Sequence, residues 1–266
     1  MALATTATGF YVGSCAWPNA FLLFKTLLGA ALLGAGASAL NQFFERQIDA
    51  RMKRTKNRPL PSGRLKAKAG LIFGILVSTL GIACLWVGVN TASGFIGLWT
   101  FGSYVFIYTP LKRKTTWNTL VGAVPGALPI LIGYTAAGRP LDQKAWVLFL
   151  ILFLWQLPHF FAIAWVHKED YQKSGFRMLC VEDNGGQRSA RQIVFCTGLL
   201  FAASLAPTLV GMAGLTYLFL AIFFGFLFMG FSWYLANSHL SDAKKFVTAS
   251  ILYLLILNVS MILDKV

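Results

Sequence analysis

Charged side chains are scarce in this 266-residue chain: they make up 12% of it, and only nine of them are Asp or Glu. A soluble domain has about 25% charged and about 45–50% apolar residues, whereas 57% of this chain is hydrophobic and its mean hydropathy is +0.65. This balance excludes a disordered chain, a coiled coil and a nucleic-acid-binding domain. It leaves an all-α polytopic membrane protein, with the lipid bilayer as its surroundings.

Cysteine is also rare, and the four cysteines show neither CxxC spacing nor a cluster with His. A secreted disulfide scaffold is therefore excluded, and we interpret these cysteines as packing residues. The apolar residues that follow Met1 have no basic segment before them, so we expect no signal peptide.

Long uncharged runs, divided at Pro, Gly and Asn, predict the membrane spans, each of which needs about 20 apolar residues. We expect one domain over residues 1–266, without a second soluble domain or an internal repeat. The first span is short, and we expect that the start of this helix is missing from the chain. The nine predicted spans lie at about 2–16, 20–45, 69–89, 93–110, 117–136, 145–166, 191–208, 214–236 and 245–263.

The positive charge is concentrated on one side of the predicted membrane. Of the 23 Lys and Arg residues, 19 lie in the loops 46–68, 111–116, 167–191 and 237–245. The segments on the other side of the predicted membrane hold the remaining four Lys and Arg residues. The positive-inside rule therefore places the four basic loops in the cytoplasm and the C-terminus outside.

Two of the nine acidic residues end the second predicted span, together with an amide. Asn41, Glu45 and Asp49 are spaced i, i+4 and i+8, so their side chains share one helix face. Ionisable groups at this depth are costly and indicate function. Three oxygen ligands on one face are suited to Mg²⁺, which also takes phosphate oxygens from a substrate. The alternative is a solvated helix end with ordinary polar residues.

A basic loop follows this acidic face. Arg54 and Arg58 precede Pro59, Pro61 and Gly63, which stiffen and direct the loop. Guanidinium groups bind phosphate oxygens in pairs, so the loop has the features of a diphosphate clamp. A basic loop beside a membrane is also explained by topology and by anionic lipid.

A third polar cluster ends the sixth span. Pro158 kinks the helix, and His159 lies beside the kink, about two turns inside the membrane. An ionisable side chain at this depth indicates a functional site, but a histidine that is merely hydrogen-bonded in the bundle is equally consistent. Lys168 and Asp170, at the interface, form either part of a site or a surface ion pair.

The fifth predicted span contains a segment that is suited to forming a cavity. A short basic loop with Lys112 and Arg113 precedes this segment, and Tyr108 and Asn118 lie on either side of the loop. The residues 122–134 that follow are rich in Gly and Pro. Residues of these types permit close helix contact and open a cavity, although packing alone explains most of the segment.

At these residues the chain resembles the haem branch of the UbiA superfamily of intramembrane prenyltransferases, over nearly its whole length. The first motif in other members is typically Asn-x-x-x-Asp-x-x-x-Asp, and Glu45 together with the His159 segment points to the haem branch. The most specific motifs are Asn41-Gln-x-x-Glu45-x-x-x-Asp49, Arg54-Thr-x-x-Arg58-Pro-Leu-Pro-x-Gly63, and Trp155-Gln-x-Pro158-His159-Phe followed by Lys168-x-Asp170-Tyr171-x-x-x-Gly175-x-x-Met178-Leu179.

The resemblance implies a nine-transmembrane-helix bundle of the UbiA type around a central cavity, with cytoplasmic cap loops, in a bacterial inner (plasma) membrane. It implies that farnesyl diphosphate and protohaem IX (haem B) react, with addition of water, to give haem O and pyrophosphate. Haem is then a substrate, Mg²⁺ is the cofactor, and a downstream haem A synthase is an expected partner.

The resemblance also assigns residues to roles. It implies Mg²⁺ ligands at Asn41, Glu45, Asp49 and Asp170, although Ser174 stands where others have a second Asp. With Arg54, Arg58 and His159 these form the expected catalytic set. The expected substrate-binding residues are Arg54, Arg58, Tyr108, Lys112, Arg113, Asn118, Trp155, Lys168 and Tyr171.

Three other functions are open at this point. A secondary transporter also has many helices and buried polar groups, but the Pro-broken segments at 125–129 and 158 lack the matching halves expected of one. A haem-binding assembly factor explains His159 but not the acidic face with its arginine loop. A prenyltransferase for an aromatic ring or a chlorophyll-type alcohol is the nearest alternative.

Overall fold

The computed structural model describes residues 1–15, 17–238 and 240–266, and these residues are almost entirely helical. Among them there is no strand beyond a single bridge between Ala213 and Lys265. The helices are α1 (Ala2–Gly13), α2 (Ala20–Asp49), α3 (Ala67–Gly88), α4 (Thr91–Gly102), the π-helix η1 (Ser103–Tyr108), α5 (Thr109–Leu111), α6 (Asn118–Ala136), α7 (Gln143–Val166), α8 (Lys168–Ser174), α9 (Leu179–Glu182), α10 (Gln187–Ser204), α11 (Ala206–Leu209), α12 (Leu215–Asn237) and α13 (Ala243–Leu263).

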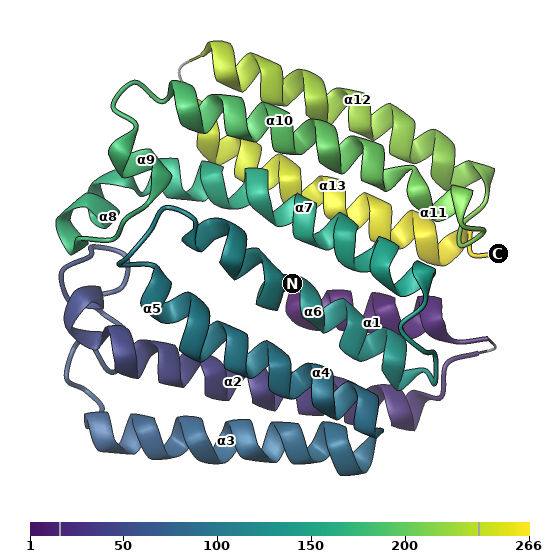
Figure 1. Cartoon of the computed structure of the whole chain (residues 1–266), viewed down its shortest axis with the longest axis horizontal. Helices are drawn as coiled ribbons and strands as arrows, with labels where there is room; N and C mark the ends of the chain where they lie inside the picture. Colours follow the sequence, from purple (N-terminus) through teal and green to yellow (C-terminus); the bar gives the residue numbers. More distant parts are fainter. Residues whose placement is uncertain (16, 239) are drawn as a thin grey trace.

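The long helices run side by side across the molecule (Figure 1). Within the described ranges, seven helices are long and apolar enough to cross a membrane. The two remaining predicted spans correspond to the short α1 and to the continuous series α4, η1 and α5. The predicted all-α membrane fold is therefore confirmed.

The polar segments gather at one end of this bundle. The loop after α2, the end of α5, and helices α8 and α9 lie together at the left of Figure 1, while the C-terminus lies at the right. Three of the loops predicted to face the cytoplasm thus meet over one end of the bundle.

Some helix ends differ from the predicted ones. The first helix ends at Gly13, where Ser14 turns to an extended conformation, and the predicted end at position 16 lies outside the described residues. The second helix continues through Asp49, because neither Gly nor Pro interrupts the polar segment after residue 45. In the fourth span, Thr109 N–H bonds to the carbonyl of Tyr104, five residues back, just before Pro110, which has no N–H to donate.

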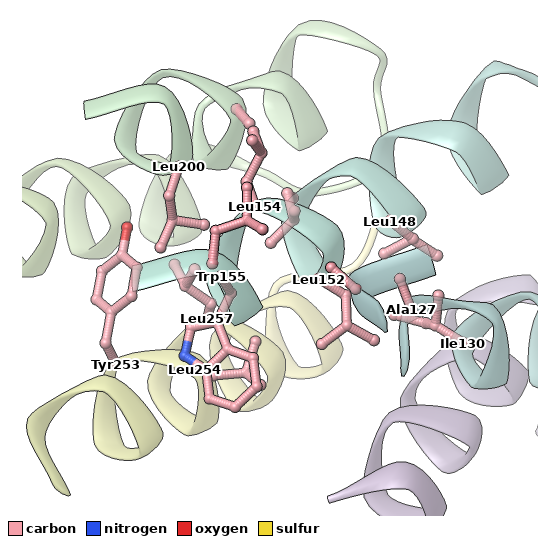
Figure 2. Close-up of a cluster of buried hydrophobic side chains, with 14 of the residues drawn as sticks. Ala127, Ile130, Leu148, Leu152, Leu154, Trp155, Leu200, Tyr253, Leu254 and Leu257 are labelled. Carbon is pink, nitrogen blue, oxygen red and sulfur yellow. The ribbon is translucent and has the colours of Figure 1, made fainter. Parts of the chain in front are cut away.

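Helix α6 lies at the centre of the packing, with 15 of its 19 residues buried. It approaches α1 so closely that a Cβ on Gly133 would lie 1.9 Å from the carbonyl oxygen of Thr6, and one on Gly9 would lie 2.0 Å from that of Ile130. Small residues permit this approach in membrane bundles. Figure 2 shows the adjoining core, where side chains of α6, α7, α10 and α13 meet around Trp155.

Candidate active site

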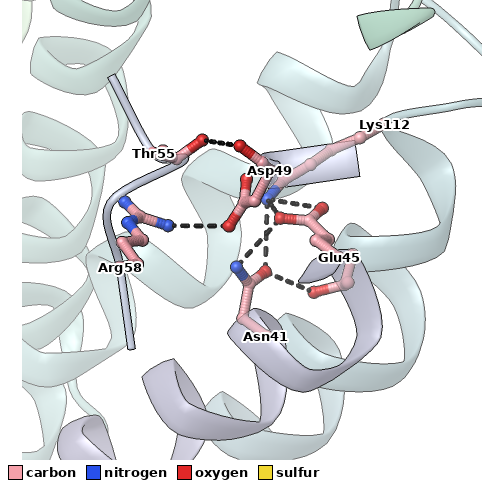
Figure 3. Close-up of polar contacts among 7 residues, drawn as sticks. Asn41, Glu45, Asp49, Thr55, Arg58 and Lys112 are labelled. Atoms are coloured by element: carbon pink, nitrogen blue, oxygen red, sulfur yellow. Dashed lines mark hydrogen bonds and ion pairs between the residues drawn. The ribbon is translucent and has the colours of Figure 1, made fainter. Parts of the chain in front are cut away.

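The acidic face of α2 is buried at the polar end of the bundle (Figure 3). Asn41, Glu45 and Asp49 are 6%, 5% and 2% exposed, and the amide Nδ2 of Asn41 donates to Glu45 Oε2 at 2.9 Å. Solvation of an ordinary helix end therefore does not account for these side chains. Two ionisable carboxyl groups are withdrawn from water, which requires charge partners nearby.

Lys112 is the partner of Glu45. Its ammonium lies 3.0 Å from Oε1 and 3.1 Å from Oε2 of Glu45, and it donates to Asn41 Oδ1 at 3.2 Å. Thr109 Oγ1 donates to the same amide oxygen at 3.1 Å. Lys112 is 9% exposed and follows the π-helical turn, which sets the register of this segment against α2. A single ammonium group thus lies among three oxygens of α2.

Arg58 is the partner of Asp49. Its guanidinium lies 3.1 Å from Asp49 Oδ2, while Thr55 Oγ1 donates to the backbone carbonyl of Asp49 at 2.9 Å. The two contacts fold the loop after α2 back over the helix end (Figure 3). The Arg58 side chain is 36% exposed, so part of its guanidinium is open to a ligand.

Asp170, on α8, contacts the same loop through its backbone. Its two carboxylate oxygens accept the N–H groups of Lys53 at 3.1 Å and Arg54 at 3.3 Å. Burial acts to raise the pKa of this carboxyl, but the two backbone donors, together with the nearby charges of His167 and Lys53, hold the pKa below its ordinary value. Asp170 therefore joins α8 to the loop after α2, and none of its hydrogen bonds in the described chain is to the acidic face of α2.

The remaining predicted residues are distributed around this polar end. Tyr108 lies beneath the Lys112 ammonium, 4.6 Å from ring centroid to Nζ. Asn118 Nδ2 donates to the carbonyl of Arg177 at 2.7 Å, and Arg177 N–H donates to the carbonyl of Lys112 at 2.9 Å. Arg113 is exposed.

An open pocket of about 830 Å³ lies beside the Asp170 contact. Arg54, Lys168 and Asp170 line it, among other residues. Lys168 lies 4.5 Å above the ring of Trp165 and donates to the carbonyl of Asp183 at 2.8 Å, so it does not pair with Asp170. The neighbouring Tyr171 packs edge-on against Phe176, with 6.0 Å between ring centroids.

His159 lies apart from these charges, buried between α7 and α13. Its ring stacks on Trp155 with 4.7 Å between centroids, and its Nδ1 lies 2.6 Å from Ser250 Oγ. Ser250 was not predicted from the sequence, because a serine 91 residues away in an apolar helix gives no local signal. Thr109 was missed for the same reason, since it lies 68 residues from Asn41. Thr55 was missed because its bond is to a backbone carbonyl, which every residue has.

The oxygen ligands fit a hard divalent cation. In the described part of the chain no three His, Cys, Asp or Glu side chains cluster as a metal site, and on the acidic face the third oxygen-bearing side chain is the amide of Asn41. Glu45 Oε1 is buried, and the Lys112 ammonium is its charge partner. No group in the described residues donates a hydrogen bond of suitable geometry to this oxygen. Carboxylate and amide oxygens that still have a free lone pair are the protein ligands that Mg²⁺ binds.

Comparisons with known proteins identify relatives over most of the chain. The chain matches the UbiA prenyltransferase family over residues 2–256. It is 47% identical over 245 residues to a protoheme IX farnesyltransferase of Solibacter usitatus (strain Ellin6076), covering 91% of this chain and 84% of that protein. A protoheme IX farnesyltransferase of Myxococcus xanthus (strain DK1622) is 38% identical, covering 100% of this chain and 90% of that protein.

Solved structures support the fold. A digeranylgeranylglyceryl phosphate synthase superimposes with a TM-score of 0.82 at 19% identity, covering 99% of this chain and 92% of that one. A UbiA homologue from Archaeoglobus fulgidus bound to GPP and Mg²⁺ gives a TM-score of 0.66 at 14% identity, covering 96% and 94%.

The link through Asp170 leads to a testable prediction. In Asp170→Asn, measured without divalent cations, the loop after α2 should open more readily, because an amide does not accept both N–H groups as a carboxylate does. A loss of about 1–3 kcal/mol is expected for a charged hydrogen-bond acceptor. Trypsin cleavage within residues 51–58 should become about tenfold faster or more, since every 1.4 kcal/mol is about tenfold.

The matched control is Glu169→Gln, which neutralises the exposed neighbouring carboxyl. Because the pKa of Asp170 is lowered in the folded protein, this link stabilises the fold at pH values above the ordinary carboxyl pKa of about 3.9. The stabilisation is lost as the pH falls through the pKa that Asp170 has in the folded protein. Equal cleavage rates in the two variants would contradict a role for Asp170 in holding the loop.

Proposed function

This chain belongs to the UbiA prenyltransferase family, and on that premise we propose that it transfers the farnesyl group of farnesyl diphosphate to a vinyl group of protohaem IX. The C–O bond to the diphosphate breaks, a new C–C bond forms at the outer vinyl carbon, and water adds to the inner one with loss of a proton. The products are haem O and pyrophosphate. The observation that supports this is the buried acidic face of α2 with Lys112 and Arg58 against it.

Asn41, Glu45 and Asp49 would hold Mg²⁺, and Asp170 is the fourth proposed ligand. When bound, the ion would neutralise the charge that grows on the diphosphate as the C–O bond breaks. Each carboxylate oxygen of Asp170 already accepts one N–H, from Lys53 or Arg54, and keeps one lone pair for a cation. None of its hydrogen bonds in the described chain is to the acidic face of α2, so the three residues on α2 are the better-supported set.

The cations of the chain would bind the leaving group. Arg58, partly exposed beside Asp49, and Arg54, in the open pocket, are proposed to bind phosphate oxygens through their guanidinium groups. Lys112 is proposed to turn from Glu45 to the diphosphate once another cation neutralises Glu45. Preorganised positive charge of this kind lowers the barrier to loss of a diphosphate.

The haem half of the reaction is assigned to the apolar interior. His159 and Trp155 are the proposed residues on that side, with Tyr108, Arg113, Asn118, Lys168 and Tyr171 as further substrate contacts. The apolar interior would keep water from the allylic cation until the vinyl carbon attacks, and aromatic faces stabilise such a cation. A downstream haem A synthase is the proposed recipient of haem O.

The function is tested on purified protein in lipid vesicles supplied with farnesyl diphosphate, haem B and Mg²⁺. Mass spectrometry of extracted haems should show haem O, with an equal amount of pyrophosphate released. Asp49→Asn should lower the rate on the order of a hundredfold or more, the cost typical of losing a preorganised electrostatic group.

The matched control for that variant is Asp242→Asn, the same change in a surface carboxyl that pairs with Lys245, which should keep normal turnover. Haem recovered unchanged from the wild-type reaction would contradict the proposed activity. Prenylation of a different acceptor under the same conditions would favour the aromatic or chlorophyll-type alternative.

The position of Lys112 predicts that its removal strengthens metal binding and weakens substrate binding. Without diphosphate, Lys112→Gln should bind Mn²⁺ about tenfold more tightly than the wild type, because the ammonium that competes for Asn41 and Glu45 is gone. With farnesyl diphosphate present, the same variant should bind that substrate more weakly. Electron paramagnetic resonance of free Mn²⁺ measures the first effect.

Lys114→Gln is the control, since Lys114 is an exposed cation two residues away. Mn²⁺ affinity that falls in Lys112→Gln without diphosphate would place the metal elsewhere.

The proposed orientation puts the polar end of the bundle in the cytoplasm of a bacterial cell. Single cysteines at exposed positions 56 and 173 should react with a membrane-impermeant maleimide only from the cytoplasmic face, and one at position 141 only from the opposite face. A Cys15→Ser background removes the exposed native thiol. Labelling of positions 56 and 141 from one face would contradict the topology.

A further inference from the structure

The imidazole of His159 is held by a residue on another helix. Ser250 of α13 is fully buried, and its Oγ lies 2.6 Å from His159 Nδ1. Trp155 stacks on the imidazole and donates its indole N–H to the backbone carbonyl of the same serine at 2.6 Å. His159 is therefore fixed on both its face and one of its ring nitrogens.

The hydrogen-bond directions determine which nitrogen has the proton. Ser250 Oγ lies 2.7 Å from the backbone carbonyl oxygen of Val247. A carbonyl oxygen only accepts, and a hydroxyl has one hydrogen, so Ser250 donates that hydrogen to Val247. Toward His159 the hydroxyl then acts as an acceptor, and the bond requires a hydrogen on Nδ1. In the neutral imidazole, Nε2 is left with a lone pair.

Nothing in the described chain takes this lone pair. The structure gives Nε2 of His159 no hydrogen-bond partner among these residues. His159 lines a small cavity of about 150 Å³, with Gly126, Leu152 and Phe160 among its other walls. Three other wall residues have side-chain donors, and each donates to a backbone carbonyl: Gln156 to Ala123 and Leu152, Trp155 to Ser250, and Thr5 to Ala2.

We propose that Ser250 is a positioning residue that holds His159 as the Nδ1–H tautomer, so that Nε2 offers its lone pair to the iron of bound protohaem. The inference rests on the proposed function, because it is the haem substrate that supplies the iron. Histidines that ligate metals commonly donate their other N–H to a fixed acceptor, which sets the tautomer and the ring orientation. Ser250 supplies that acceptor from α13, and it does not itself touch the substrate.

The first test is made on the protein without substrate. The chain has three histidines, so selective ¹⁵N labelling gives few signals, and His159→Gln identifies the one from His159. A long-range ¹H–¹⁵N correlation spectrum of the wild type should show the proton on Nδ1 and a bare Nε2. A proton on Nε2 would overturn the proposal.

The second test compares two serines of the same helix. Ser250→Ala and Ser260→Ala each remove a buried hydroxyl that donates to a backbone carbonyl one turn back, at 2.7 Å in both cases. Only Ser250 also contacts a histidine. Haem affinity, followed by the absorbance change on iron ligation, should fall about 10–100-fold in Ser250→Ala and stay at the wild-type value in Ser260→Ala.

A third arm uses iron-free protoporphyrin IX, whose affinity should be the same in the wild type and in Ser250→Ala. Equal losses for haem and for the iron-free porphyrin would overturn iron ligation. Wild-type protein that shows the Nδ1–H tautomer and ligates haem, yet makes no haem O, would contradict the proposed function while leaving this inference in place.

Discussion

A carboxylate buried at the end of a membrane helix needs a cation beside it, and the polar end of this molecule is organised around that requirement. Glu45 and Asp49 are each almost fully buried, and leaving either one unpaired would cost several kcal/mol. Lys112 and Arg58 supply the charge from two different segments. Both segments must therefore cover the same end of α2, which places a basic loop on each side of its acidic face.

The cap over this end is held mainly by backbone groups. Asp170 accepts two N–H groups of the loop after α2, and the N–H of Arg177 donates to the carbonyl of Lys112. Asn118 donates to the carbonyl of Arg177 in turn. These bonds connect the loop after α2, the end of α5 and the segment of α8 and α9 into one unit. The backbone of Lys112 is thereby joined to the segment that follows α8, the helix that contains Asp170.

The sequence predicted the features that depend on local spacing. The helical spans follow from runs of apolar residues, and the shared face of Asn41, Glu45 and Asp49 follows from the period of one helix. The pairing of Glu45 with Lys112 spans 67 residues and has no periodic signature. The bonds of Asp170 were not predictable, because backbone N–H groups are the same at every residue type. Ser250 gave no signal for a related reason, since many helical serines bond only to their own backbone.

The two chemical environments of the proposed reaction lie at different depths for a physical reason. Ionisation of an allylic diphosphate needs positive charge at the leaving oxygens, and charge is tolerated at the membrane surface, where Arg58 is partly exposed. The cation that remains needs an environment without water or nucleophilic oxygens. His159 and Trp155 lie in such an apolar region, where Nδ1 of His159 and Nε1 of Trp155 are bonded to Ser250 of α13. Charged and apolar surroundings are therefore supplied by different segments of one bundle, because an unpaired charge is costly in lipid.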